Sequence, residues 1–556
     1  MNAGIRAQLA QHFAAANTLL AGGDARGALS LAQQAWNLAP DDADCCNLVG
    51  VCAIALGDGA TAERCWLQAM ALNPDTVEAR RNLARYYRES GRAEEAERCL
   101  RQVIALAPSD AGSHLLLAHL LAARKDPEAA PCYRQALTLD SSLAEAWANL
   151  ALLLEKEKNW AEAEAHHRHA LTLAPESSEI HANLGNLLAR QQRMDEAEHE
   201  YRQALALKPD SAVAHSNLGV LQADLGHDAE AEQSLRRALQ LNPGYQLARH
   251  NLAMLLLTQG RLEEGWPLHE ARYHPDLPEP DAPLPLLPAK QWQGESLQGK
   301  RLLVWPEQGY GDMIQFCRYL PLLKQLGAER IDLVCRKAQV TLLETLAGVD
   351  RVAALDDAAA LIGEHDYWAL PMSLPLHCGT TLATIPAHLP YLHAPVNRRA
   401  IWRERMAGTG RKIGLVWRGN AHHANDRNRS LPDFSALYAL LSVENATFFS
   451  LQPATHETLP SQVVDLGADI GDFADSAAII EQLDLLITVD TAIAHLAGAL
   501  GKPCWIMLPV HRPDWRWLRG RSDSPWYPGV VRLYRQGAGE SWQTVVDRIA
   551  HNLRIG

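Results

Sequence analysis

Asp312 directly follows a short apolar run in the second half of the chain and is well suited to take up a proton. The run covers residues 301–305, and glycines at 309 and 311 allow a tight turn and a close backbone approach to a ligand. A carboxylate held there can remove the proton of a hydroxyl group. An aspartate at this place can also simply cap the helix predicted over residues 313–324. Both roles stay open from the residues alone.

A second strand-to-helix junction lies at Asp490-Thr491-Ala492, after the apolar run 485–489. The free amide groups and the dipole of a helix that starts here favour an anion such as a diphosphate. Asp490 itself would repel a phosphate. His495 lies on the first turns of the same predicted helix, on the face of Thr491. A single histidine on an apolar helix is otherwise a packed core residue, and both readings stay open.

The loop of residues 417–430 is basic and follows the strand predicted over residues 412–417. Arg429 is its best candidate for binding phosphate, because a guanidinium matches two phosphate oxygens at once. His422 and His423 have no third His, Cys or carboxylate at ligand spacing, so we expect no metal site.

Short β-rich runs alternate with helical patterns from residue 299 onward and must position these side chains. The runs are 301–305, 331–335, 351–355, 412–417, 447–451, 485–489 and 504–508. Such alternation predicts a parallel, doubly wound α/β sheet. We expect two Rossmann-like units, over residues 299–400 and 401–556, with a cleft lined by the carboxyl ends of their strands.

The sequence before residue 273 is helical and periodic. A proline recurs about every 34 residues, at Pro40, Pro74, Pro108, Pro175, Pro209 and Pro243, with Ser141 in the remaining place. Small residues repeat with the same period, as at Ala163, Ala197 and Ala231. The pattern resembles the tetratricopeptide repeat and predicts an all-α superhelix over residues 1–272, with about seven repeats and capping helices. The prolines of residues 273–298 predict an extended linker.

The predicted first helices of the repeats carry asparagines at nearly equivalent places: Asn82, Asn149, Asn183, Asn217 and Asn251. This ladder resembles the superhelical repeats of the O-linked N-acetylglucosamine transferases, in which asparagine amides hold the backbone of an extended polypeptide. An amide suits that task because it offers both a donor and an acceptor. We expect Asn149, Asn183, Asn217 and Asn251 to contact a protein acceptor. The alternative is a solvated helix face, and Leu116 breaks the ladder in the third repeat.

Two segments resemble the signatures of heptosyltransferase-type glycosyltransferases. They are Gly309-Tyr-Gly-Asp312 and Val489-Asp-Thr-Ala-Ile-Ala-His-Leu-Ala-Gly-Ala-Leu-Gly501. With the repeats in front and the segments 513–517 and 523–528 behind, nearly the whole chain resembles the bacterial tetratricopeptide glycosyltransferases, which include flagellin glycosyltransferases of the FlmG type. The resemblance implies a GT-B fold, a nucleotide-sugar donor, no metal and inversion at the anomeric carbon.

The same resemblance implies roles for single residues. Asp312 would be the base, and Arg429 and His495 would lie near the leaving diphosphate. Asp490 would hold its loop or contact a sugar or ribose hydroxyl, beside Thr491 and Ala492. Gln452, after the strand predicted over residues 447–451, would lie at the nucleotide base. Trp515, Trp517 and Trp526 could stack on a ligand, but we expect such large aromatics to pack one domain against another.

Composition narrows the remaining function classes. Charged residues make up 21% of the 556 residues, the formal net charge is −13, and no Lys/Arg-rich stripe appears, so nucleic acid is a poor candidate partner. No apolar run reaches the length of about 18 residues that a membrane-spanning helix needs, and we expect a cytoplasmic protein. The ten cysteines include no Cys-x-x-Cys pair and are expected to be buried free thiols.

Together these observations predict a protein O-glycosyltransferase that uses a nucleotide-sugar and no other cofactor. Its acceptor would be a protein held by the repeats, with flagellin as one candidate. One alternative is an interaction scaffold whose glycosyltransferase domain is inactive, because tetratricopeptide arrays often act as scaffolds. Another is a lipopolysaccharide glycosyltransferase, but a lipid acceptor has no need of a long peptide groove.

Overall fold

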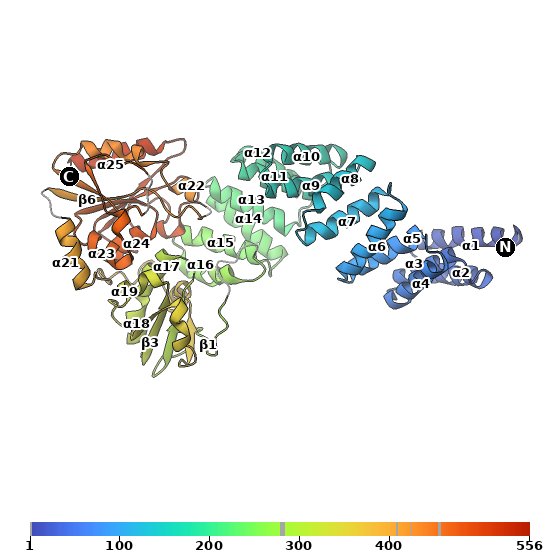
Figure 1. The fold of residues 1–556 in the computed structure, drawn as a ribbon, viewed down its shortest axis with the longest axis horizontal. Helices are drawn as coiled ribbons and strands as arrows, with labels where there is room; N and C mark the ends of the chain where they lie inside the picture. The colour runs from blue at the N-terminus through green and yellow to red at the C-terminus, as the bar shows by residue number, and fades with distance from the viewer. Residues whose placement is uncertain are drawn as a thin grey trace. The chain divides into compact units, whose positions relative to one another are not determined.

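The computed structural model describes residues 3–277, 284–307, 309–406, 410–423, 425–453 and 457–555 (Figure 1). Contacts between residues divide the chain into two compact units, Met1–Asp210 and Ser211–Gly556. Residues 278–283 of the predicted linker lie outside the described residues.

The first unit consists of helices that pack in successive antiparallel pairs. They are α1 (Ala3–Ala21), α2 (Ala25–Leu38), α3 (Ala43–Ala55), α4 (Gly59–Leu72), α5 (Val77–Glu89), α6 (Ala93–Leu106), α7 (Ala111–Ala123), α8 (Ala129–Leu139), α9 (Ala144–Lys156), α10 (Trp160–Leu173), α11 (Ser178–Arg190) and α12 (Met194–Leu207). Ala163 and Ala197 of the predicted small-residue column are fully buried on α10 and α12. Small residues at these places let neighbouring helices lie close together.

The turn inside each helix pair needs a residue in the left-handed region. Gly57 and Gly91 take φ angles of 80° and 75°, and Lys125 and Lys158 take 57° and 62° at the equivalent turns. Glycine adopts this region freely, whereas another residue there costs roughly 1 kcal/mol. Gly57 and Gly91 therefore form their turns without this conformational cost.

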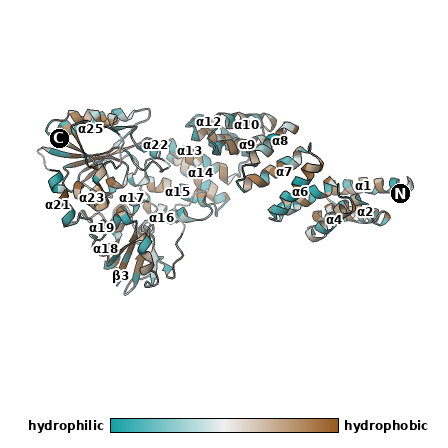
Figure 2. Cartoon of the chain, in the orientation of Figure 1, coloured by the Kyte–Doolittle hydropathy of each residue, from teal (hydrophilic) through white to brown (hydrophobic). Residues whose placement is uncertain are grey.

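Two further helix pairs begin the second unit. They are α13 (Ala212–Asp224) with α14 (Asp228–Leu241), and α15 (Gln246–Thr258) with α16 (Leu262–His269), followed by the short 3-10 helix η1 (Glu270–Tyr273). The repeat helices carry hydrophilic and hydrophobic residues side by side, as expected of helices with one buried face (Figure 2).

A five-stranded parallel sheet follows these helices, with the strand order β1-β5-β2-β3-β4. Its strands are β1 (Lys290–Gln291), β2 (Arg301–Val304), β3 (Arg330–Cys335), β4 (Arg351–Ala354) and β5 (Tyr367–Ala369). The runs predicted near β2, β3 and β4 are confirmed as strands. The sequence patterns missed β1 and β5, which are too short to show a period, and β1 lies inside the segment predicted as linker.

The C-terminal sheet is also parallel, with the order β11-β10-β9-β6-β7-β8. Its strands are β6 (Arg411–Val416), β7 (Ala446–Ser450), β8 (Val463–Asp465), β9 (Leu485–Val489), β10 (Cys504–Leu508) and β11 (Val531–Arg535). The α/β fold predicted for this half of the chain is confirmed. Strands β8 and β11 were not predicted from the sequence.

Helices cover both sheets. The α-helices are α17 (Tyr310–Phe316), α18 (Leu320–Gln325), α19 (Val340–Leu343), α20 (Leu374–His377), α21 (Val396–Arg405), α22 (Asp426–Arg429), α23 (Phe473–Ile480), α24 (Ala492–Ala499) and α25 (Trp542–Ile555). The single helix predicted over residues 313–324 is wrong. The chain instead forms α17, a 3-10 turn at Cys317–Tyr319 and α18. Pro321 at the start of α18 explains the break, because its ring cannot continue the preceding helix.

The apolar core of the second unit ties the last repeat helices to both sheets. One cluster contains Leu262 and Trp266 of α16, Leu302 of β2 and Leu486 of β9. A second cluster fills the opposite face of the C-terminal sheet, under α25. Because β9 is buried along its whole length, its sequence is a continuous apolar run.

The cysteines are free, and eight of the ten are buried, with Cys132 and Cys378 half-buried. The prediction of buried thiols is therefore confirmed for most of them. Within the described ranges, no helix combines the length and the apolar character needed to cross a bilayer.

Candidate active site

A cavity of about 760 Å³ lies in the second unit, between the last repeat helices and the two sheets. Its lining residues include Asn251, Asp312, Arg429, Asp490, Asp514 and Arg516. Asn251 comes from α15 of the repeats, whereas Asp312 follows the first sheet's strand β2 and Asp490 follows β9 of the second sheet. The cavity therefore brings together three of the predicted transferase residues and one of the predicted acceptor-binding asparagines.

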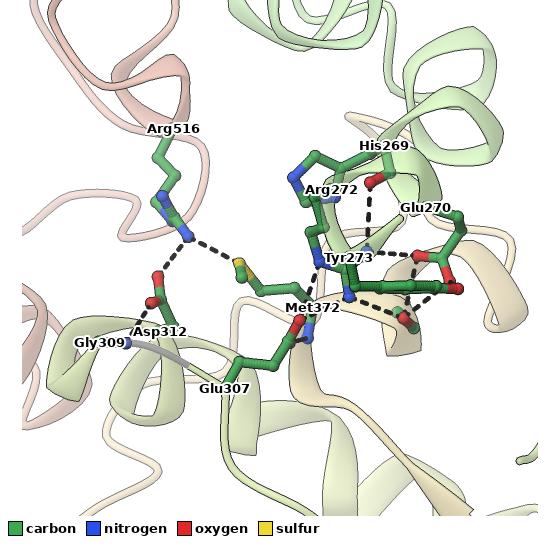
Figure 3. A network of polar contacts seen from close by, with 10 residues as sticks. His269, Glu270, Arg272, Tyr273, Glu307, Gly309, Asp312, Met372 and Arg516 are labelled. Atoms are coloured by element: carbon green, nitrogen blue, oxygen red, sulfur yellow. Dashed lines mark hydrogen bonds and ion pairs between the residues drawn. The ribbon is translucent and has the colours of Figure 1, made fainter. Parts of the chain in front are cut away.

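Asp312 is held by both of its carboxylate oxygens (Figure 3). Oδ2 accepts a hydrogen bond of 2.9 Å from the backbone N–H of Gly309, at the start of α17. Oδ1 forms an ion pair with Nη2 of Arg516 at 2.5 Å. The side chain keeps 20% of its surface exposed and lines the cavity. The bond to Gly309 fits the role of a helix cap. The exposed surface in the cavity fits the role of a base, so both roles stay open.

Buried Asp490 and half-buried Asp514 are acidic neighbours in the cavity wall. Burial and, next to it, the Asp514 carboxylate raise the pKa of Asp490 to about 7. Burial alone would raise the pKa of Asp514, but the Arg516 guanidinium and backbone N–H hold it below its usual value. Asp490 consequently changes charge near neutral pH, which is a property that a general acid or base requires.

The other residues of the second signature lie outside the cavity lining. Thr491 precedes α24 in extended conformation, and its Oγ1 lies 3.2 Å from Oγ1 of Thr488. His495 is buried, with Nδ1 at 2.9 Å from the Tyr527 hydroxyl and its ring stacked on Trp517. Burial lowers the pKa of His495 to about 3, so the ring is neutral at pH 7. Its contacts are those of a packed residue.

The two signature segments touch each other through Gly311. A Cβ atom at Gly311 would lie 3.0 Å from Cδ2 of His495 and 3.6 Å from Cα of Ala492. The missing side chain therefore allows α17 to pack closely on α24. Ala492 takes part in this contact, which joins the helix carrying Asp312 to the helix that follows Asp490.

Arg429 points its guanidinium toward the cavity from α22, with 15% of the side chain exposed. Its Nε lies 3.3 Å from Oδ1 of Asp426. Gly419 makes room for it, since a Cβ there would lie 2.7 Å from Nη2 of Arg429. His423 also lines the cavity, and burial, followed by the charge of Arg429, lowers its pKa. Arg429 is therefore placed to bind an anion inside the cavity.

Gln452 supports the basic loop and is not part of the cavity lining. Its Oε1 accepts a hydrogen bond of 3.0 Å from the backbone N–H of Arg418. Gln452 thus contacts the backbone of the basic loop. Asp312, Arg429 and Asp490 line the cavity, and Gln452 does not.

The asparagine ladder forms hydrogen bonds along the row of first helices. Nδ2 of Asn82 donates to Asn47 at 2.9 Å, and Nδ2 of Asn149 lies 3.1 Å from Nε2 of His119. In the second unit, Nδ2 of Asn251 donates to Ser216 at 3.4 Å. Asn183 on α11 and Asn217 on α13 are half-buried. Leu116, which interrupts the ladder, instead packs against an apolar cluster.

The tryptophans of the C-terminal segment pack rather than face open space. Trp517 and Trp526 are fully buried, and Trp515 is 3% exposed. Trp515 meets Trp266 of α16 edge-on, with ring centroids 5.4 Å apart. These aromatics therefore pack against the last repeat helix and other side chains inside the second unit.

A buried ion-pair network follows the last repeat helix (Figure 3). Arg272 is fully buried and binds Oε1 of Glu307 through Nε at 2.8 Å and Nη2 at 2.6 Å. Glu307 also accepts the backbone N–H of Met372 at 2.8 Å. Burial raises the pKa of Glu307 despite its cationic partner. Since Arg272 follows the last repeat helix and Glu307 follows β2, the network fixes the repeats to the first sheet.

Among the described residues, no group of three or more His, Cys, Asp or Glu side chains could hold a metal ion. Guanidinium groups in the cavity wall, among them those of Arg429 and Arg516, supply positive charge.

Comparisons with known proteins support the repeat assignment. Models described as tetratricopeptide repeat match residues 45–109, 146–179 and 212–245, and a model described as TPR repeat matches residues 185–226. These segments of the helical part of the chain are tetratricopeptide repeats. A curated relative, Protein FlbA of Caulobacter vibrioides, is 29% identical over 327 residues. That match covers 54% of each protein, so the chain spans about half the length of this relative.

Solved structures resemble the tetratricopeptide part at low identity. The APC/C hetero-tetramer Cut9-Hcn1 is 18% identical, with a TM-score of 0.38, over 43% of this chain and 48% of that chain. PilF of Pseudomonas aeruginosa is 23% identical, with a TM-score of 0.31, over 35% and 87%. YrrB, described as a TPR protein with an unusual peptide-binding site, is 22% identical, with a TM-score of 0.29, over 33% and 96%.

Two charged residues of the cavity, Asp514 and Arg516, were not predicted from the sequence. They belong to the segment Pro513-Asp-Trp-Arg-Trp517, which attracts attention through its tryptophans. The available signal was an arginine between two tryptophans, a pattern that favours a buried position. A buried guanidinium needs carboxylate partners. The structure shows these partners to be Asp514 and Asp312.

Proposed function

We propose that the chain is a protein O-glycosyltransferase, with a heptosyltransferase-like GT-B domain behind tetratricopeptide repeats. It would transfer a sugar from a nucleotide-sugar to a serine or threonine hydroxyl of a protein acceptor. The observation that carries the proposal is the shared cavity, whose wall includes Asn251 of the repeats as well as Asp312 and Arg429. A site walled by both parts suits a reaction between a bound polypeptide and a small donor.

In the proposed reaction Asp312 accepts the proton of the acceptor hydroxyl. The hydroxyl oxygen forms a bond to the anomeric carbon while the bond from that carbon to the phosphate oxygen breaks. Attack from the face opposite the leaving group inverts the anomeric centre. The departing nucleotide carries the negative charge away, and Arg429 stabilises it. No cofactor besides the nucleotide-sugar is part of the proposal.

The remaining predicted residues act indirectly in this scheme. The contacts of Ala492 and His495 with Gly311 support the packing of α24 on α17, and Thr491 contacts Thr488 just before α24. Gln452 supports the loop that carries Arg429. Asp490, whose pKa near 7 suits a group that accepts or donates a hydrogen bond, would contact a hydroxyl of the sugar or ribose.

The acceptor would lie along the first helices of the repeats, where Asn149, Asn183, Asn217 and Asn251 offer amide groups. Flagellin is the first acceptor to test, because the sequence resembles flagellin glycosyltransferases over nearly its whole length. The relative FlbA adds weak support, since its match covers about half of each protein.

The experiment is an intact-mass measurement of flagellin after incubation with the purified protein and a panel of UDP-, GDP-, CMP- and ADP-sugars. We expect one donor to add a fixed mass to serine or threonine, and Asp312→Asn to abolish the shift. The Asp490→Asn variant should keep part of the activity, because it retains the proposed base. The absence of a mass shift with all donors, together with no thermal stabilisation by any of them, would favour an interaction scaffold.

A further inference from the structure

The segment of residues 512–519 contacts the repeats on both sides of Arg516. Nη2 of Arg512 binds Oδ2 of Asp224 on α13 at 2.6 Å. Arg519 forms an ion pair with Asp228 of α14, and its backbone N–H donates to the Thr258 carbonyl at 2.9 Å. These contacts fix both ends of a short segment on the last repeat helices. Arg516, which lies between them, is thereby held in a defined place.

The guanidinium of Arg516 is packed and bonded through both of its terminal nitrogens. Its side chain is 7% exposed, and Cζ lies 4.6 Å from the ring centre of Trp515 and 5.5 Å from that of Phe316. Nη1 binds Oδ2 of Asp514 at 2.8 Å, and Nη2 binds Oδ1 of Asp312 at 2.5 Å. A planar group packed against aromatic rings and bonded at two corners has little freedom to turn.

Asp312 has no comparable support of its own. It lies within the first turn of α17, and its bond to Gly309 leaves the Oδ1 oxygen to be held by another group. Arg516 is the group that binds this oxygen. Without this ion pair, the carboxylate could rotate about its side-chain bonds and turn away from the cavity.

We propose that Arg516 is a positioning residue that fixes the Asp312 carboxylate for removal of the acceptor proton. The inference rests on the proposed function and adds a residue to it. The proton passes from the acceptor hydroxyl to Asp312, while Arg516 keeps its own proton and charge throughout. Because the segment 512–519 is bonded to α13, α14 and α15, the repeats themselves set the place of the base.

The rival role for Arg516 is direct binding of the leaving phosphate, and a double-mutant cycle separates the two. We expect Arg516→Ala to lower kcat by about 100-fold, the loss typical of a misplaced catalytic group, with little change in donor KM. Arg516→Lys, which keeps the charge, should recover part of the rate. In the Asp312→Asn background, Arg516→Ala should cost nothing further, since the group that it positions is gone.

The rates are followed by mass spectrometry of the acceptor, with residual rates of the slow variants measured over long incubations. Arg521→Ala is the matched control, because Arg521 pairs with exposed Asp523 in the same region and is expected to keep the wild-type rate. Multiplicative losses in the double variant, or a raised donor KM in Arg516→Ala, would overturn the positioning role while leaving the transferase function intact. An inactive wild type would overturn the proposed function and this inference with it.

Discussion

At the residue scale, the cavity contains acidic side chains in different environments. Asp312 is partly exposed and paired with a guanidinium, whereas Asp490 is buried beside a second carboxylate. Such differences allow chemically identical groups to take different roles in one site. The partly exposed carboxylate suits proton removal from a substrate hydroxyl, and the buried one suits a hydrogen bond that fixes a ligand.

The raised pKa of Asp490 predicts a pH dependence of stability. Because its pKa is about 7 in the folded protein and about 4 in an unfolded chain, the folded state alone keeps the proton between these values. The free energy of unfolding therefore falls as the pH rises from about 4 to about 7, by about 1.4 kcal/mol for each unit of pKa difference. Asp490→Asn removes this loss, so the variant should unfold at a higher temperature than the wild type at pH 8.

The measurement is thermal unfolding of both proteins at pH 5 and pH 8, with a smaller difference expected at pH 5. Asp523→Asn serves as the control. The hydrogen bond from Arg521 lowers the pKa of Asp523, so the contribution of Asp523 to stability changes only at acidic pH. An equal difference at both pH values would mean that Asp490 does not keep its proton in the folded protein.

Arg429 should determine affinity for the phosphate part of the donor. Arg429→Ala removes a charged hydrogen-bond donor, and we expect at least a tenfold loss in affinity for UDP or GDP, corresponding to about 1.5 kcal/mol. Affinity for uridine or guanosine should not change. The exposed Arg427 of the same loop offers a matched control in Arg427→Ala. Calorimetric titration checks the prediction, which fails if nucleoside and nucleotide weaken equally.

At the element scale, close packing of α24 holds the site together. Gly311 lets α17 approach this helix, and Gly498 lies under the ring of Tyr527 on its other side. Tyr527 in turn bonds to His495. Gly311 of the first signature and Gly498 of the second thus meet packing requirements that are independent of any ligand.

Gly498→Ala should therefore destabilise the second unit. The added Cβ would lie 2.3 Å from Cδ1 of Tyr527, so the ring must move, at a cost of about 1–3 kcal/mol. Gly244→Ala provides the control, because its Cβ would come no closer than 3.5 Å to another atom. Thermal unfolding measures both variants. Equal melting temperatures for the two would show that the contact around Gly498 is looser than described.

The first helices of the repeats should bind the acceptor through their asparagines. Replacing Asn183, Asn217 and Asn251 by alanine removes amide groups worth about 1 kcal/mol each. We expect acceptor affinity to fall by tenfold or more and donor affinity to stay the same. The matched control replaces exposed residues on the second helices of the same pairs, Gln203, Glu230 and Glu263. Unchanged acceptor affinity in the asparagine variant would refute binding along this row.

At the scale of the whole molecule, the last repeats belong to the same compact unit as the sheets. Trp266 of α16 donates its indole N–H to the Thr380 carbonyl at 3.0 Å, and Arg272 binds the buried Glu307. A division of the chain after residue 272 therefore cuts through a packed and charged core. The repeats of this unit are structurally part of the α/β domain.

Fragments of the chain test this organisation. The fragment 211–556 should be folded and bind the same nucleotides as the full chain, because it keeps the whole second unit. The fragment 273–556 lacks Arg272, which leaves Glu307 buried without a cation, a loss of about 3–5 kcal/mol. We expect it to be insoluble or to melt at a much lower temperature. Equal stability of the two fragments in thermal unfolding would contradict the prediction.

The sequence by itself determined the repeats and most of the strands. Periodic prolines and alanines mark each helix pair because local packing repeats with the chain, and the buried β9 shows as an apolar run. The same local logic singled out Asp312, Asp490 and Arg429, since each follows a predicted strand, and all three line the cavity. It could not detect β1 or β5, whose pairing depends on neighbours far away in the chain.

Only the tertiary structure decided which of these residues meet. Asp312 and Arg516 are 204 positions apart, and no local pattern predicts an ion pair over that separation. The neutral state of His495 and the raised pKa of Asp490 follow from burial, which the chain acquires only when α24 packs between other elements. The place of Asn251 beside Asp312 likewise depends on the docking of α15 and α16 against the sheets through Trp266 and Trp515.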